Sequence, residues 1–240
     1  MDWFKTWFNT PYYHLLYGNR NDEEAAFFID NLLGYLKLPP ASRCWDLNCG
    51  KGRHSVYLNK KGYEIIGTDL SAESIFFARQ YETDSLHFYK HDMRNLFYAN
   101  YFNAVFNLFT SFGYFKNKRD DEKVFQSVYT ALKPEGIFVI DFFNASCVLA
   151  NLKANGEKQV GDVSFHIRKK VENNIILKEI TVEDKTGKHL FKEEVKAFTL
   201  TDFTELANKV GLKVKHCFGN YRLDAFDVNS SERLIIIFEK

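Results

Sequence analysis

A short turn rich in small residues stands between a predicted strand and a predicted helix, over Trp45–His54. Gly50 and Gly52 allow the backbone of such a turn to approach a ligand closely, and the helix behind it directs its first N–H groups toward that ligand. Asp69 ends the next predicted strand, where a carboxylate can accept hydrogen bonds from both hydroxyls of a ribose. The turn, the strands and the acid together predict a site for a cofactor that contains adenosine.

The glycine pattern of this turn indicates which kind of adenosine-containing cofactor it can bind. A dinucleotide fingerprint, G-x-G-x-x-G, aligned on Gly50 requires glycine at the two places that Asn48 and Arg53 occupy. Asp46 would repel a pyrophosphate, but it suits the cationic amino group of an amino-acid moiety. The turn therefore departs from the NAD pattern and fits a cofactor that carries an amino acid.

Several motifs, in their order along the chain, resemble those of the class I S-adenosylmethionine-dependent methyltransferases, in the small-molecule-type branch. The turn resembles their motif I, D-x-G-x-G-x-G, and Asp69–Ser71 resembles their ribose-binding acid with the helix cap that follows it. His91–Arg94 is similar to the adenine-contact motif. Asn107–Phe115 resembles the end of the fourth strand with its loop, and Leu132–Gly136 resembles the turn before the fifth strand.

The resemblance implies S-adenosylmethionine as the cofactor and indicates which residues would hold it. They are Asp46, Asn48, Gly50 and Gly52 for the methionine part, Asp69 and Leu70 for the ribose, Asp92 and Met93 for the adenine, and Asn107, Leu108 and Phe109 beside the sulfonium and its methyl group. The chain departs from the family at Asn48, which stands where the first glycine is expected. Asparagine tolerates a positive φ better than most residues, so we expect the turn to keep its shape.

Aromatic residues are the candidates for orienting the substrate, because a methyl sulfonium is already activated and chiefly needs alignment with its nucleophile. These candidates are Tyr12, Tyr13 and Tyr114, the first two in an N-terminal segment that also carries Tyr17 and Arg20. Their rings and hydroxyls could line the cation and the substrate, or the rings could only pack the segment on the domain. A general base is required only where the acceptor arrives protonated. We expect neither a catalytic triad nor a metal site.

Strands and helices alternate over residues 43–143, which predicts an α/β fold with a parallel sheet covered by helices on both faces. The resemblance implies a Rossmann-like, seven-stranded, mostly parallel sheet in the order 3-2-1-4-5-7-6, with strand 7 antiparallel. Before it, a helix capped by Asn21 belongs to an N-terminal helical cap over residues 1–38. The cofactor-binding domain is expected over residues 1–154 and 199–240. Alternating apolar and polar residues over 155–198 predict an inserted three-stranded antiparallel meander that would serve as a lid.

The charge balance argues against a protein whose main task is to bind duplex nucleic acid. The chain has 240 residues, 45% of them hydrophobic, and its formal net charge of +1 lacks the basic excess of such proteins. The predicted fourth strand also ends without the prolines of an N-P-P-Y-like motif. The run His166–Lys170 could touch an acidic substrate, or it could be the solvent-facing side of a strand. A small molecule in an enclosed, aromatic-lined pocket is the expected substrate.

The cysteines and the apolar runs predict a soluble cytoplasmic protein. The four cysteines form no C-x-x-C pair, the start of the chain lacks a leader pattern, and the longest apolar run, Leu234–Phe238, is too short to span a bilayer. We expect a monomer or homodimer without a nucleic-acid or membrane partner. Other functions stay open: a methyltransferase fold that binds or regulates without turnover, an NAD-dependent oxidoreductase, or an RNA or protein methyltransferase.

Overall fold

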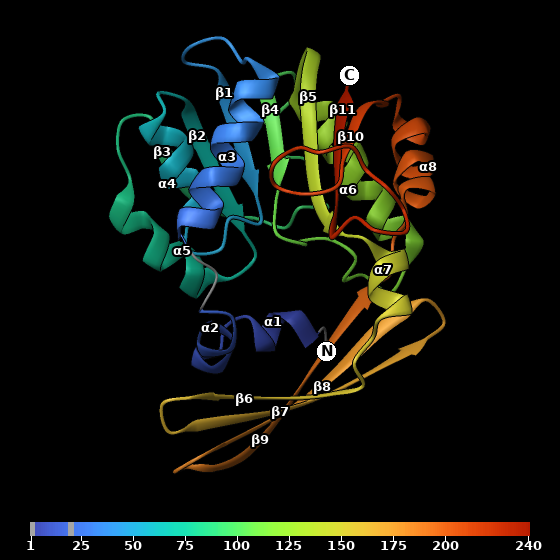
Figure 1. The fold of residues 1–240 in the computed structure, drawn as a ribbon. Coiled ribbons are helices and arrows are strands. Elements are labelled where there is room, and N and C mark those ends of the chain that lie inside the picture. The colour runs from blue at the N-terminus through green and yellow to red at the C-terminus, as the bar shows by residue number, and fades with distance from the viewer. Residues whose placement is uncertain (1–2, 19–21) are drawn as a thin grey trace.

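The computed structural model describes residues 3–18 and 22–240. Its centre is a seven-stranded sheet in the order β10-β11-β5-β4-β1-β2-β3 (Figure 1). In chain order these strands are β1 (Arg43–Leu47), β2 (Glu64–Asp69), β3 (Leu86–Lys90), β4 (Phe102–Asn107), β5 (Leu132–Phe143), β10 (Lys213–Phe218) and β11 (Arg233–Glu239). The last strand, β11, runs antiparallel to both of its neighbours, β5 and β10. The mostly parallel sheet and its expected strand order are confirmed.

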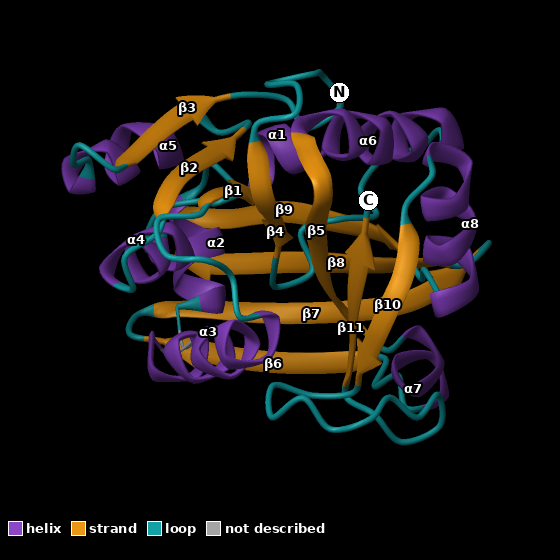
Figure 2. Ribbon diagram, turned by 90° about the horizontal axis from the view of Figure 1, so that it is seen from above, coloured by secondary structure: helices purple, strands orange, loops and turns teal. Residues whose placement is uncertain are grey.

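Helices cover both faces of this sheet (Figure 2). On one face lie α3 (Asp22–Leu36), α4 (Arg53–Lys60) and α5 (Ala72–Ala78), which a 3-10 turn, η1 (Arg79–Tyr81), continues; on the other lie α6 (Lys118–Ala131) and α8 (Leu200–Val210). The central strands β4 and β11 are buried along most of their length, as expected of strands with helices on both sides. Across residues 3–18 and 22–240, no helix is long and apolar enough to cross a membrane.

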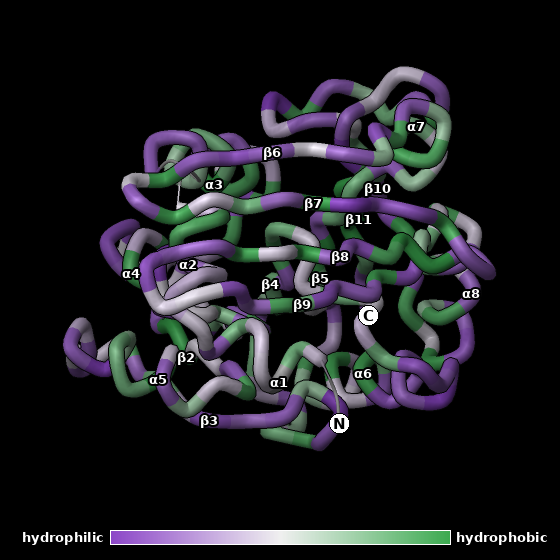
Figure 3. Tube along the Cα trace, turned by 90° about the horizontal axis from the view of Figure 1, so that it is seen from below, coloured by the Kyte–Doolittle hydropathy of each residue, from purple (hydrophilic) through white to green (hydrophobic). Residues whose placement is uncertain are grey.

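A second sheet, called the inserted sheet below, follows β5 and the short helix α7 (Ala145–Ala150). Its strands are β6 (Asn155–Val160), β7 (Val163–Glu172), β8 (Ile175–Asp184) and β9 (Gly187–Lys196), antiparallel in that order. Seen from below, they run side by side across the molecule (Figure 3). The expectation of three strands is wrong: β6 was not predicted because its sequence, NGEKQV, offers one strongly apolar residue. The division into two domains at these bounds stays a prediction.

Two short helices lie between the two sheets: α1 (Trp3–Trp7) and α2 (Pro11–Tyr17). The indole N–H of buried Trp7 donates to Glu193 Oε1 on β9 at 2.8 Å. The hydroxyl of Tyr17 donates to the same oxygen at 2.7 Å. One carboxylate, that of Glu193, therefore bonds both N-terminal helices to the inserted sheet. Arg20 and Asn21, which the sequence analysis singles out, lie outside the described residues.

The fifth strand begins earlier than the sequence predicts. It includes residues 133–136, a segment that the sequence indicates as a turn, and the strand pairs with β4 at Leu132 and again from Ile137 onward. Glu135 has a φ of +61°, and the register against β4 shifts nearby. This segment is therefore an irregular start of the strand, which keeps the bend that the sequence indicates.

Gly67 in β2 leaves room for the ring of Phe88 on β3. A Cβ on this glycine would lie 2.6 Å from Phe88 Cδ1 and 2.9 Å from Ser55 Oγ. Because Phe88 is fully buried, we expect Gly67→Ala to lower the free energy of unfolding by about 1–3 kcal/mol, measured by urea denaturation. The control is Gly156→Ala in β6, where a Cβ would meet nothing within 4 Å. Equal losses in the two variants would contradict the packing explanation.

Candidate active site

A cavity of about 640 Å³ opens where the carboxyl ends of the central strands face the N-terminal helices and the inserted sheet. Its size is within the range of small-molecule sites, roughly 300–1,000 Å³. Of the residues assigned from the sequence, those that line it are Tyr13, Asn48, Gly50, Asp69, Leu70, Asp92, Met93, Leu108, Phe109 and Tyr114. Those that do not are Tyr12, Asp46, Gly52 and Asn107. The fold thus brings most of the predicted site to one cavity.

The turn after β1 keeps its expected shape with asparagine at its first position. Asn48, Gly50 and Gly52 have φ values of +65°, +56° and +85°, all in the left-handed region. The Asn48 side chain donates through Nδ2 to the Ser111 carbonyl at 2.7 Å and to Met93 Sδ at 3.1 Å. A glycine at position 48 would keep the backbone shape and lose both contacts. The departure from the family pattern therefore ties the turn to the loops that follow β3 and β4.

Asp69 closes this turn from the end of β2. Its Oδ2 accepts from the Gly50 N–H at 2.9 Å, and its Oδ1 accepts from the Ser71 N–H at 2.8 Å. Burial raises the pKa of Asp69, while the two backbone donors favour its ionised form. Ser71 in turn caps α5 by accepting from the Ser74 N–H at 3.0 Å. The carboxylate is held in one orientation at the cavity, and each oxygen has a further lone pair for a hydroxyl donor.

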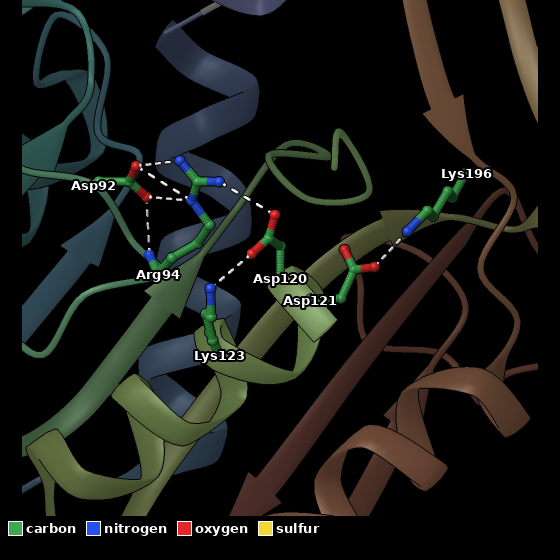
Figure 4. Close-up of polar contacts among 6 residues, drawn as sticks. All are labelled: Asp92, Arg94, Asp120, Asp121, Lys123 and Lys196. Atoms are coloured by element: carbon green, nitrogen blue, oxygen red, sulfur yellow. Dashed lines mark hydrogen bonds and ion pairs between the residues drawn. The ribbon is translucent and has the colours of Figure 1, made fainter. Parts of the chain in front are cut away.

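Asp92, which follows β3, is held by a guanidinium group (Figure 4). Arg94 Nη2 lies 2.6 Å from Asp92 Oδ2, and Arg94 Nε lies 3.0 Å from Asp92 Oδ1. Burial opposes a charge on Asp92, but the hydrogen bonds and the charge of Arg94 hold its pKa below the usual value. Arg94 also donates to Asp120 on α6 at 3.3 Å and lies 4.8 Å over the ring of Phe115. The carboxylate expected at the adenine is therefore ionised and oriented.

A second ion pair fixes the point where the inserted sheet returns to the central domain (Figure 4). Lys196, the last residue of β9, donates through Nζ to Asp121 on α6. Asp121 is fully buried, and burial raises its pKa to about 6 in spite of this pairing. The Lys196 N–H also donates to the Gly113 carbonyl at 2.9 Å. The end of the inserted sheet is thereby joined to the loop after β4.

Three of the assigned residues lie beneath the cavity wall. The buried Asp46 carboxylate accepts from the Ser55 hydroxyl at 2.5 Å, and burial raises its pKa to about 6. Asn107 donates through Nδ2 to the Leu47 carbonyl at 3.2 Å, and its Oδ1 has no partner in the part of the chain that the structure describes. Gly52 is the N-cap residue before α4, at a point where a Cβ would press on the buried ring of Phe88. All three support the turn, and direct contact with the cofactor stays a prediction for each.

The three candidate tyrosines are placed differently. Tyr13 and Tyr114 line the cavity, and both pack on Phe8, with ring centroids 4.8 and 5.5 Å apart. Tyr12 lies against the inserted sheet, where its hydroxyl donates to Asp184 Oδ2 at 2.7 Å. Tyr12 therefore packs on the inserted sheet in this structure, and a role in positioning the substrate stays a prediction for it as well. For Tyr13 and Tyr114, contact with the substrate stays a prediction.

The loop after β4 contains two consecutive non-glycine residues in the left-handed region. Phe109 and Thr110 have φ values of +57° and +62°, a conformation that costs roughly 1–3 kcal/mol for each residue. The Phe109 N–H donates to Asp141 Oδ2 at 2.9 Å, and Asp141 pairs with Arg233 at 2.7 Å. Arg233 also donates to Thr110 Oγ1 at 3.0 Å. A buried ion pair thus holds Phe109 at the cavity, and the sequence analysis did not anticipate Arg233.

Comparison with known proteins agrees with this geometry. A family model described as a methyltransferase domain matches residues 40–209. The chain belongs to this family. Over 95% of both chains it also superposes on an S-adenosylmethionine-dependent methyltransferase structure from Clostridium acetobutylicum ATCC 824, with a TM-score of 0.79 and 19% identity. The methyltransferase family and the fold expected from the sequence are confirmed.

Curated relatives of this methyltransferase-domain chain match it over segments. It is 41% identical over 107 residues to the putative methyltransferase YqeM of Bacillus subtilis (strain 168), which is 43% of each chain. It is 28% identical over 163 residues to the dTDP-3-amino-3,4,6-trideoxy-alpha-D-glucopyranose N,N-dimethyltransferase of Streptomyces venezuelae, 65% of this chain and 68% of that one. It is 31% identical over 138 residues to the glycine/sarcosine N-methyltransferase of Halorhodospira halochloris, 55% and 49% of the two chains. The matches thus span about half the length of the first and third of these relatives.

The ion pair between Asp141 and Arg233 should be important for stability, because Asp141 is fully buried. Arg233→Met leaves that carboxylate without its cation, and we expect the free energy of unfolding to fall by about 3–5 kcal/mol in urea denaturation. The control is Arg43→Met, which breaks a pair with Glu64 whose side chains are 44% and 48% exposed. That pair should contribute about 0–1 kcal/mol. A loss at position 233 no larger than the loss at position 43 would contradict the role given to the buried pair.

Proposed function

We propose that the protein is an S-adenosylmethionine-dependent methyltransferase that acts on a small molecule held in the cavity. The observation that carries the proposal is the placement of Asp69, whose carboxylate is fixed by two backbone amides at the cavity wall. Met93 and Phe109 line the same cavity and offer apolar surface for an adenine and a methyl group. The arrangement combines an acceptor for ribose hydroxyls with the family's turn.

The residues around Asp69 fit this cofactor in shape and in charge. A Cβ on Gly50 would meet nothing within 4 Å, so the turn offers open backbone at the cavity. The Asn48 side chain is directed to Ser111 and Met93, so it is held by protein contacts. Asp92 is ionised and can accept from an adenine amino group. When bound, the cofactor supplies an electrophilic methyl group on a sulfonium.

The chain's own contribution to transfer is orientation and exclusion of water. The aromatic residues Trp3, Phe4 and Phe8 line the cavity from the N-terminal segment, together with Tyr13 and Tyr114. Aromatic faces attract a cation, and a covered cavity keeps water from competing with the acceptor. Alignment of two bound reactants can account for about 7–11 kcal/mol of a barrier. The site therefore needs no covalent intermediate on the protein.

An amine nitrogen is the acceptor atom that we propose. Support comes from the relatives of Streptomyces venezuelae and Halorhodospira halochloris, which are named as N-methyltransferases for an amino sugar and for glycine or sarcosine. The mechanism also suits an amine, because a neutral amine is a nucleophile without an activating metal or a covalent step.

Asp69 should control cofactor binding. We expect the purified protein to bind S-adenosylmethionine and not NADH in calorimetric titrations, and Asp69→Ala to weaken binding by at least about tenfold, since a carboxylate bonded to two hydroxyls is lost. Asp69→Asn keeps the size of the side chain and should give an intermediate loss. Asp84→Ala, at an exposed acid away from the cavity, is the control. Unchanged affinity in the Asp69 variants would remove its assigned role, and binding of NADH alone would overturn the cofactor assignment.

The acceptor atom can be tested with matched amines and alcohols. We expect methyl transfer from S-adenosylmethionine to nitrogen in a panel of glycine, sarcosine and a dTDP-linked 3-amino sugar, detected by mass spectrometry of the products. Glycolate, which carries a hydroxyl in place of the amine of glycine, should stay unmodified. Transfer to oxygen, or cofactor binding with no transfer to any amine, would contradict the proposed acceptor.

A further inference from the structure

A row of three charged residues crosses the inserted sheet. Lys169 on β7 is paired directly with Lys178 on β8, and Lys178 is paired directly with Glu193 on β9. Directly opposed residues of antiparallel strands project from the same face of a sheet. All three side chains line the cavity, so this face of the inserted sheet is the one that covers the candidate active site.

The rows on either side of these charges are apolar. One consists of Ile167, Ile180 and Phe191, and the other of Val171, Ile176 and Val195. A charged group on such a face costs free energy unless an opposite charge or hydrogen bonds compensate it. A charged row between two apolar rows, on the face that covers the cavity, is therefore a candidate for a functional position.

Two of the three charges compensate each other. Lys178 Nζ lies 2.6 Å from Glu193 Oε2, and the same ammonium donates to the Tyr17 hydroxyl at 2.6 Å. Glu193 Oε1 accepts from Trp7 and Tyr17. Lys178 and Glu193 are thus paired by groups of the protein itself, and their two charges sum to zero.

The third charge, on Lys169, has no such compensation. Among the described residues its ammonium group has neither a hydrogen bond nor an ion pair, although the backbone N–H of Lys169 donates to the Ala154 carbonyl at 2.7 Å. Lys169 is half-buried, and burial followed by the nearby charge of Lys178 lowers its pKa. The charge of Glu193 opposes this shift only in part, because no anion among the described residues is bonded to the Lys169 ammonium. A cation that lines a covered cavity in this way matches a ligand that brings the anion.

We infer that Lys169 binds an oxyanion of the methyl acceptor, a carboxylate or a phosphoryl group. The inference rests on the proposed function, because it takes the cavity to hold the acceptor beside the cofactor. The Lys178–Glu193 pair fixes the neighbouring position on the sheet and limits the oxyanion to the Lys169 side. Ile176 and Leu152 belong to one apolar cluster and also line the cavity. Apolar surroundings lower the local dielectric and so strengthen an ion pair.

The experiment titrates inorganic phosphate and, separately, acetate into protein saturated with S-adenosylhomocysteine, followed by backbone amide chemical shifts of β7–β9. We expect saturable binding of at least one anion. Tighter binding of phosphate would indicate a phosphoryl ligand, and tighter binding of acetate would indicate a carboxylate. Lys169→Met keeps the apolar stem and should raise the dissociation constant of the anion by about tenfold or more. Lys169→Arg keeps the charge and should bind the anion about as tightly as the wild type. The matched control is Lys170→Met on the exposed side of β7, where the ammonium pairs with Glu172; anion binding should be unchanged.

Three outcomes would overturn the inference. They are anion binding of equal strength in Lys169→Met and the wild type, no anion binding in the wild type, and loss of S-adenosylhomocysteine affinity in Lys169→Met, which would assign this lysine to the cofactor. A wild-type protein that does not bind S-adenosylhomocysteine is a different failure, because it rejects the proposed function itself. The anion titrations are therefore repeated without the cofactor product, so that the two failures are distinguished.

Discussion

The hydrogen bond from the Gly50 amide to Asp69 joins the ends of the first two strands at the place where the cavity opens. It continues the pairing of β1 with β2, because the preceding amide, that of Cys49, donates to the Thr68 carbonyl at 2.9 Å. The same carboxylate accepts from Ser71, which caps α5. One side chain therefore sets the turn, the end of a strand and the start of a helix. The remaining site residues are arranged around a carboxylate that is already oriented before any ligand arrives.

The sequence was sufficient for the features that depend on local patterns. Alternating strands and helices predicted the central sheet, and the spacing of Asn48, Gly50 and Asp69 predicted a common site because these residues end neighbouring strands. Arg233 could not be found in this way, since its partner Asp141 is 92 positions distant and only the antiparallel pairing of β11 with β5 brings them together. The partners of the Asn48 side chain could not be predicted for the same reason, because they are distant in the sequence.

The inserted sheet shows that the residues of a charged run cannot be assigned to one environment as a group. The run His166–Lys170 could be interpreted as solvent-facing or as a substrate contact, and the structure divides it by strand alternation. His166, Arg168 and Lys170 are exposed, whereas Lys169 is half-buried at the cavity. Strand alternation alone cannot say which set faces inward, because both sets carry charge. The decision comes from the packing of the apolar neighbours, Ile167 among them, against the hydrophobic core.

The contacts of Glu193 have a consequence for how ligands enter and leave. Two residues of the N-terminal helices, Trp7 and Tyr17, donate to this carboxylate, and Lys178 neutralises it from the neighbouring strand. Separating α1 and α2 from β9 would strip a buried anion of two donors, a step that is expensive in a low-dielectric setting. The less costly opening keeps these contacts and moves the helices and the inserted sheet together. Segments far apart in the chain are thus joined into one cover, which meets the central domain at the pairing of Lys196 with Asp121 and at the ring of Phe115, on which Phe4 of α1 packs.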